Sequence, residues 1–339
     1  MSEEIKNMTK PTTILTGFLG AGETTYLNHL LSSKPNTRFA IIENEYGEQS
    51  IDSELIIRAE DDIIELNNGC LCCTLNDNLY DILNTLFTRR AEYDEIIIEA
   101  TGVADPRGLA EPFIIHHSIK KQFPLTGVIC LVDAELIEDQ LQETEEAIHQ
   151  ITFSDVLLVN KTDLVSEQYL GELTQRLRQL NPLAKVIFGN QDAFPVIGKI
   201  ERDGELDAIF DQSKHSSNNN FPVQKPPHHH HHEHTKVVSH TILFDQPFDE
   251  QKLRHRLMVY LNFQSKGLYR MKGLIWMNES DDQYLLQSVS KQLNISQKRH
   301  WQLTEKRQSI IVFIGKDIQL KGLEKMLRQC LASPEATQL

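Results

Sequence analysis

Short apolar runs rich in β-branched residues recur along residues 11–210, separated by stretches in which apolar residues return every three or four positions. Runs of this kind are typical of buried parallel strands, and the intervening period is typical of amphipathic helices. The expected strands are Thr13–Thr16, Phe39–Ile42, Ile63–Leu66, Ile96–Ile98, Val128–Val132, Val156–Val159 and Val186–Phe188. The alternation predicts an α/β domain built on a doubly wound, mostly parallel sheet.

Two helices of this domain follow loops that contain chemically distinctive residues. Thr24–Leu31 reads as the helix after the first strand and a glycine-containing loop. A second helix is predicted by apolar residues at helical spacing, namely Leu75, Leu79, Ile82, Leu83 and Leu86. Because ligands of open α/β sheets bind outside the carboxyl ends of the strands, we expect both loops to lie at one edge of the sheet.

The composition changes between Asp211 and Thr235, where Ser, Asn, Pro and His replace the apolar residues, and this predicts a linker. Beyond it the pattern predicts strands at Val237–Phe244, Gly273–Met277 and Ser309–Ile314, and helices at Asp249–Leu261, Gln283–Leu293 and Leu320–Leu331. The expected organisation is a flexible tail over 1–10, the α/β domain over 11–210, a His-rich linker over 211–235, a smaller α+β domain over 236–332, and a tail over 333–339.

The formal net charge of −14 is unevenly distributed, since residues 1–235 carry −20 and residues 236–339 carry +6. The acidic balance of the first part argues against nucleic acid as a partner, and the asymmetry allows docking between the halves or with a client protein. Solvated faces of opposite sign explain it equally well. Neither a signal peptide nor an apolar run long enough to cross a membrane is present, so we expect a cytoplasmic protein without membrane contact.

Residues 17–25, Gly-Phe-Leu-Gly-Ala-Gly-Glu-Thr-Thr, match the phosphate-binding pattern G-x-x-x-x-G-K-S/T except where Glu23 replaces the lysine. The glycines allow a tight path that directs backbone N–H groups at phosphates. The residues expected to contact nucleotide here are Gly17, Gly20, Ala21, Gly22, Glu23, Thr24 and Thr25. A carboxylate about 4 Å from a phosphate opposes each phosphate charge by about 4 kcal/mol at an effective dielectric of about 20. Unless Glu23 turns into water, nucleotide binding should weaken and hydrolysis should suffer more.

The tetrapeptide Glu99-Ala100-Thr101-Gly102 follows the strand Ile96–Ile98. An acid at this point can lie near Mg²⁺, and the N–H of Gly102 can contact a γ-phosphate, while Thr24 supplies a hydroxyl for the same ion. Glu23, Thr24 and Glu99 are therefore the residues expected to govern catalysis. The alternative for Glu99 is a charge at a strand end without a function.

Asn160-Lys161-Thr162-Asp163 directly follows the strand Val156–Val159. An aspartate in such a loop accepts two hydrogen bonds, from N1–H and from the exocyclic amine of guanine, and adenine offers no such donor pair. We therefore expect Asn160, Lys161 and Asp163 to contact the base of GTP or GDP. An ATP-dependent kinase finds little support.

Cys70, Cys72 and Cys73 lie within four residues of one another, and three thiolates suit Zn²⁺ or Cu⁺. Carboxylates of Glu43 and Glu48 can complete a four-coordinate site, giving a site open enough to release metal. The alternative is a turn of small buried residues. Cys130 and Cys330 are expected to be structural. The histidine run at 228–232 is either a metal buffer or a polar spacer that happens to bind metal.

These motifs occur in one order: the glycine loop, Glu43–Glu48, the C-x-C-C cysteines, Glu99–Gly102 and Asn160–Asp163. In this the chain resembles the CobW-like metallochaperone GTPases over nearly its whole length, with Glu23 as the departure. The resemblance implies binding of GTP with Mg²⁺, retention of a transition metal, most often Zn²⁺, and its delivery to a client metalloprotein; homo-oligomerisation is left open. The competing interpretation is a non-hydrolysing zinc-binding or metal-sensing module with a vestigial nucleotide site.

Overall fold

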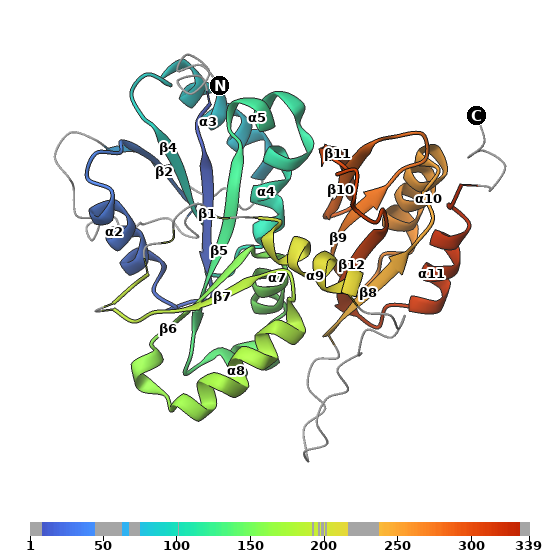
Figure 1. Ribbon diagram of the computed structural model, residues 1–339. Coiled ribbons are helices and arrows are strands. Elements are labelled where there is room, and N and C mark those ends of the chain that lie inside the picture. Colours follow the sequence, from blue (N-terminus) through green and yellow to red (C-terminus); the bar gives the residue numbers. More distant parts are fainter. Residues whose placement is uncertain are drawn as a thin grey trace. The chain divides into compact units, whose positions relative to one another are not determined.

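The computed structural model describes residues 9–44, 63–67, 75–100, 102–191, 193–195, 197, 200, 202–215 and 237–332, with 43–44, 63–67, 75–78 and 213–215 as backbone only. The chain divides into two compact units. The first consists of Met1–Arg178 with Ala184–Arg202, and the second of Gln179–Leu183 with Asp203–Leu339. Each unit has its own sheet (Figure 1).

The first unit is built on a seven-stranded sheet in which all neighbouring strands are parallel. Its order is β3 (Ile63–Asn67), β2 (Phe39–Asn44), β4 (Glu95–Ala100), β1 (Thr12–Gly17), β5 (Leu125–Asp133), β6 (Val156–Asn160) and β7 (Lys185–Phe188). Strands β2, β3 and β4 lie on one side of β1, and β5, β6 and β7 lie on the other. Strand β4 pairs directly with β1, so the ends of these two strands lie together, with Leu15 opposite Glu99. The predicted doubly wound parallel sheet is confirmed.

Helices lie on both sides of this sheet (Figure 1). They are α2 (Glu23–Ser33), α3 (Leu75–Thr88), α4 (Pro106–Ile115), α5 (His117–Gln122), α6 (Ile137–Glu143), α7 (Glu145–Phe153) and α8 (Glu167–Leu180), with a short 3₁₀ helix η2 (Thr162–Leu164). Helix α2 buries Leu27 and Leu30 in a core with Leu15 and Leu131. Because both faces are covered, all five residues of β6 are buried, which explains why the strands read as continuous apolar runs.

The second unit contains a five-stranded antiparallel sheet with the order β11-β10-β9-β12-β8. Its elements are α9 (Gly204–His215), β8 (Val237–Phe244), α10 (Glu250–Phe263), β9 (Leu268–Trp276), β10 (Asp282–Val289), β11 (Gln292–His300), β12 (Ser309–Lys316) and α11 (Leu320–Arg328). Leu253 and Leu257 of α10 and Leu327 of α11 share a core with Phe313 of β12. This confirms a smaller α+β domain.

The helix predicted over Gln283–Leu293 is wrong, because this stretch forms β10, a turn and the start of β11. Leu285, Leu286, Val289 and Leu293 have a spacing that a helix would also satisfy. Ser290, with φ of 51°, turns the chain so that Val289 pairs with Gln292. Pairing of β10 with β9 buries Leu286 and Val289 completely or nearly so, and this tertiary packing overrides the local pattern.

Helix α9 continues to His215, past residue 211, where the composition predicts the start of the linker. It belongs to the second compact unit, whose main segment begins at Asp203. The expected domain limits remain predictions. None of the helices in the described part of the chain has the length and apolar character that a membrane crossing requires.

Candidate nucleotide-binding site

The glycine loop joins the end of β1 at Gly17 to the start of α2 at Glu23. Gly22 is the N-cap of α2 with φ of 104°, a left-handed conformation that favours glycine. A Cβ at Gly22 would also lie 2.6 Å from Nδ2 of Asn160. Of the other loop residues expected to meet nucleotide, Ala21 is buried and Thr25 is exposed on the first turn of α2.

The Glu23 side chain turns into this loop and not into solvent. Its Oε2 accepts a hydrogen bond from the Gly22 N–H at 3.0 Å, and its Oε1 lies 2.7 Å from the position that a Cβ on Gly17 would take. Backbone N–H groups of a glycine loop before a helix are the groups that hold phosphates in such sites. A carboxylate of the protein itself therefore uses one of the donors expected to serve the nucleotide.

Burial raises the pKa of Glu23 from 4.5 to about 7, against the opposing effect of hydrogen bonds from the backbone N–H groups of Glu23 and Gly22 and of the Lys161 charge. A carboxyl group with a raised pKa binds its proton more tightly in the folded state than in the unfolded state. The folded state is therefore favoured at low pH and loses that advantage as the pH rises from 4.5 to about 7.

We predict that Glu23→Gln becomes more stable than the parent chain as the pH rises. The shift of the Glu23 pKa corresponds to about 3 kcal/mol in the free energy of unfolding, gained by the variant relative to the parent between about pH 4.5 and pH 7. Urea unfolding of both nucleotide-free proteins across this range, with a chelator present, measures the difference. A pH-independent difference would contradict the prediction.

The residues expected to hold Mg²⁺ lie together. The Thr24 hydroxyl donates to Oε1 of Glu99 at 3.0 Å, joining the first turn of α2 to the end of β4. Both offer oxygen ligands, which Mg²⁺ prefers, so the donor set fits this ion. Gly102 lies against the glycine loop as well, since a Cβ on it would be 2.8 Å from the backbone nitrogen of Leu19.

The loop expected to bind the base is fastened at three points. Asn160 Nδ2 donates to the Ala21 carbonyl at 2.8 Å, and Thr162 Oγ1 donates to the Gly189 carbonyl at 3.1 Å. Lys161, with φ of 58°, donates from Nζ to Oδ2 of the wholly buried Asp133 at 2.6 Å. These bonds bring the loop after β6 beside the phosphate-binding loop and leave Asp163 exposed.

Sequence reasoning missed Asp133. It ends β5, and its Oδ1 accepts hydrogen bonds from the N–H groups of Glu135 and Leu136 at 2.9 and 3.3 Å. A buried carboxylate paired with Lys161 fixes the lysine, and with it the loop expected to bind the base. The signal was available, because Asp133 directly follows an apolar run at a strand end, like Glu99.

The predicted metal ligands Glu48, Cys70, Cys72 and Cys73 lie outside the described residues, as does the side chain of Glu43. Among the residues that are described, no group of three His, Cys, Asp or Glu side chains could hold a metal ion. The zinc site therefore stays a prediction. The histidine run at 228–232 also lies outside the described part, whereas Cys130 and Cys330 are buried free thiols.

Comparisons with known proteins cover both units. The nucleotide-binding domain model of the CobW/HypB/UreG family matches residues 11–188, and the CobW C-terminal domain model matches residues 237–331. Zinc chaperone YjiA of Escherichia coli is 33% identical over 308 residues, which cover 89% of this chain and 93% of that protein. Zinc chaperone CobW of Pseudomonas aeruginosa is 27% identical over 95% of this chain and 92% of its own.

A solved structure, Zn(II)-bound YjiA GTPase from E. coli, matches with a TM-score of 0.65 and 27% identity, covering 96% of this chain and 99% of that one. The parallel sheet, the glycine loop before α2 and the fastened loop after β6 define a P-loop nucleotide-binding protein. Within that class, the chain belongs to the CobW/HypB/UreG family and carries the CobW C-terminal domain. The resemblance seen in the sequence is confirmed.

Proposed function

We propose that the protein is a GTP-dependent zinc chaperone that carries Zn²⁺ to a client metalloprotein and whose GTP hydrolysis is weakened by Glu23. The family membership and the named zinc chaperones among its relatives support the class of activity. The observation that supports the nucleotide dependence is the convergence of the glycine loop, Thr24, Glu99 and Asn160 at one edge of the sheet.

In this proposal each described element has a defined task. The N–H groups at the start of α2 bind phosphates, Asp163 accepts from guanine, and Thr24 with Glu99 holds Mg²⁺, which would neutralise phosphate charge. In its ionised form, Glu23 supplies a negative charge where the loop pattern has a cation. Hydrolysis suffers more than binding, because charge on the γ-phosphate oxygens is redistributed in the transition state.

The thiols are the proposed zinc ligands, with Glu43 and Glu48. Strand β3 ends at Asn67, three residues before Cys70, and Asn67 pairs with Glu43, which pairs with Glu99. Strand β3, which leads to the thiols, therefore ends at the same edge of the sheet and at the same level in the strand register as Glu99, the expected Mg²⁺ ligand. This arrangement supports coupling between nucleotide state and metal affinity.

The competing function is a zinc-binding or metal-sensing module that does not hydrolyse GTP. One observation favours this alternative. The Glu23 carboxylate accepts a hydrogen bond from the Gly22 N–H, so one of the donors expected to bind phosphate is already occupied by the protein itself.

We predict that GTP with Mg²⁺ changes the zinc dissociation constant at least about tenfold, a coupling of about 1.4 kcal/mol. A zinc titration against a competing chromophoric chelator, with and without nucleotide, measures it. The protein must be purified without an immobilised-metal resin, because the histidine run binds Zn²⁺ or Ni²⁺.

Two further measurements complete this test. Cys72→Ala with Cys73→Ala should remove the nucleotide-sensitive zinc site and leave the weaker sites of the histidine run. A zinc affinity that is the same with and without nucleotide, in the parent chain and in Glu23→Lys, would favour the passive module over the chaperone.

A further inference from the structure

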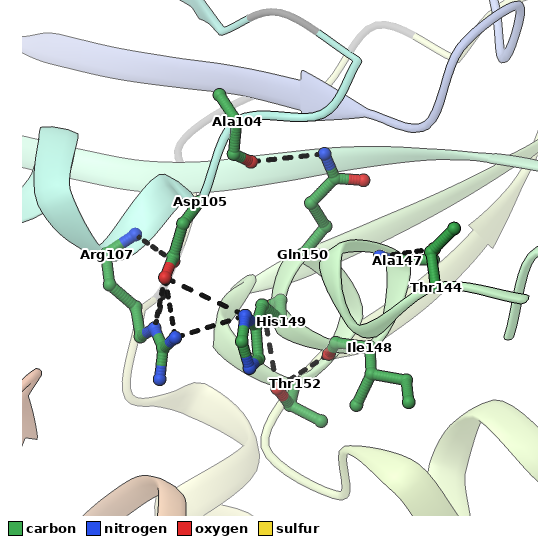
Figure 2. Close-up of polar contacts among 9 residues, drawn as sticks. All are labelled: Ala104, Asp105, Arg107, Thr144, Ala147, Ile148, His149, Gln150 and Thr152. Atoms are coloured by element: carbon green, nitrogen blue, oxygen red, sulfur yellow. Dashed lines mark hydrogen bonds and ion pairs between the residues drawn. The ribbon is translucent and has the colours of Figure 1, made fainter. Parts of the chain in front are cut away.

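The segment between β4 and α4, from Gly102 to Asp105, is bonded by Gln150 of helix α7, and the adjacent His149 of α7 lies beside Asp105 and Arg107 (Figure 2). Gln150 Nε2 donates to the carbonyl oxygens of Gly102 and Ala104, each at 3.2 Å. Gln150 itself is 1% exposed, so water has little access to the amide group that donates these bonds. One amide group thus fixes two carbonyls of the segment to α7.

The other end of the segment, at Asp105, is fixed by contacts with Arg107, which lies beside His149. Asp105 caps α4, accepting from the Arg107 N–H at 3.0 Å, and the Arg107 guanidinium donates to both carboxylate oxygens of Asp105. Arg107 Nη2 lies 3.1 Å from Nδ1 of His149. Because a guanidinium only donates, Nδ1 is the acceptor of a neutral imidazole. Burial and the Arg107 charge lower the pKa of His149, in agreement with that state.

The opposite side of the segment faces the glycine loop, since Gly102 has room for no side chain beside Leu19. The Gly102 backbone therefore lies between the phosphate-binding loop and the amide of Gln150. The remaining oxygen of that amide, Oε1, is buried and has no hydrogen-bond partner among the described residues. A buried acceptor without a hydrogen-bond partner costs stability. This cost indicates that the position of the Gln150 side chain is set by the two hydrogen bonds that its Nε2 donates.

We propose that Gln150 is a positioning residue, which holds the Gly102–Ala104 backbone against the glycine loop so that the Gly102 N–H meets the γ-phosphate of GTP. The proposal rests on the proposed function, because it assigns a role in GTP recognition. A segment already held in place loses less conformational freedom when the γ-phosphate binds. GDP lacks this phosphate, so its affinity does not depend on Gln150.

The test measures dissociation constants of GDP and of an imido-bridged, non-hydrolysable GTP analogue, both with Mg²⁺, for the full chain and for the chain with Glu23→Lys. Gln150→Leu keeps the volume and removes both donors. We expect it to raise the dissociation constant of the GTP analogue about tenfold and to leave that of GDP within about twofold. Gln140→Leu is the matched control, since Gln140 is a buried glutamine on α6 whose side chain bonds neither carbonyl.

The outcomes separate this proposal from the function on which it rests. An equal loss of affinity for both nucleotides, or a ratio no different from that of Gln140→Leu, would show that Gln150 is only structural and would overturn the proposal alone. Tighter binding of the GTP analogue by Gln150→Leu would overturn it too, because the segment would then have to leave α7 on binding. Failure of every variant and of the parent to bind either nucleotide would overturn both.

Discussion

Replacing Glu23 by lysine is expected to raise kcat/KM for GTP at least about 100-fold, which corresponds to about 2.7 kcal/mol of transition-state stabilisation. The substitution removes a carboxylate that accepts from the Gly22 N–H and supplies a cation at the start of α2. Each unit charge about 4 Å from a phosphate contributes about 4 kcal/mol at an effective dielectric of about 20, so the expected gain uses only part of the available energy. Phosphate release under saturating and sub-saturating GTP measures it.

Glu23→Gln is the control for this prediction, because it removes the negative charge without adding a positive one. We expect it to improve nucleotide affinity and to recover less turnover than Glu23→Lys. Equal rates of GTP hydrolysis for the parent chain and Glu23→Lys would show that this position does not limit the reaction, and the proposed weakening of hydrolysis would fall.

Asp163→Asn is expected to weaken GTP binding about 50-fold and to favour xanthosine triphosphate in its place. A carboxylate accepts from both N–H donors of guanine, whereas a carboxamide presents its own donors to one of them. Xanthine has a carbonyl where guanine has the exocyclic amine, so the carboxamide matches it. Titration of both triphosphates, in the parent chain and in the Glu23→Lys background, measures the change of preference.

Asp139→Asn serves as the matched control, since Asp139 is an exposed aspartate on the neighbouring helix α6 and its substitution removes the same charge. It should leave both affinities unchanged. If Asp163→Asn retains the preference for GTP, the loop after β6 does not read the base, and the assignment of guanine as the recognised base would be wrong.

The nucleotide site and the Gln150 contact suggest how one edge of the sheet works as a unit. The Glu23 carboxylate accepts a hydrogen bond within the glycine loop, and the Thr24 hydroxyl donates to Glu99. Gly102 packs against Leu19 of the loop, and its carbonyl accepts from Gln150. The contacts of Thr24 and Leu19 both join the loop to the end of β4 and the segment that follows it. Loss of one of these contacts should therefore weaken binding of the phosphates more than recognition of the base. Loss of the Asp163 carboxylate should weaken recognition of the base more than binding of the phosphates.

The parallel sheet could be predicted from the sequence because its strands are buried on both faces. A strand such as β6, with five buried residues in succession, needs an uninterrupted apolar run that few other structures need. The glycine loop could be predicted for a similar local reason, since the conformation of Gly22 is available to few other residues. The order of the motifs was sufficient to indicate the family.

Other features depended on partners distant in sequence. The stretch from Gln283 has apolar spacings that suit either a helix or a strand, and only pairing with β9 decides in favour of a strand. The direction of the Glu23 side chain depends on donors in the folded loop, and the pairing of Asp133 with Lys161 on two strand ends that the fold brings together.

Gln150 illustrates the same division, since nothing in the sequence around it distinguishes it from other glutamines of amphipathic helices. Its two hydrogen bonds span 48 and 46 residues. The sequence by itself determined the strands, the glycine loop and the types of side chain at the strand ends, because these depend on local backbone preference and on burial. The tertiary structure decided which polar groups meet, because a hydrogen bond between distant residues depends on the packing of the whole unit.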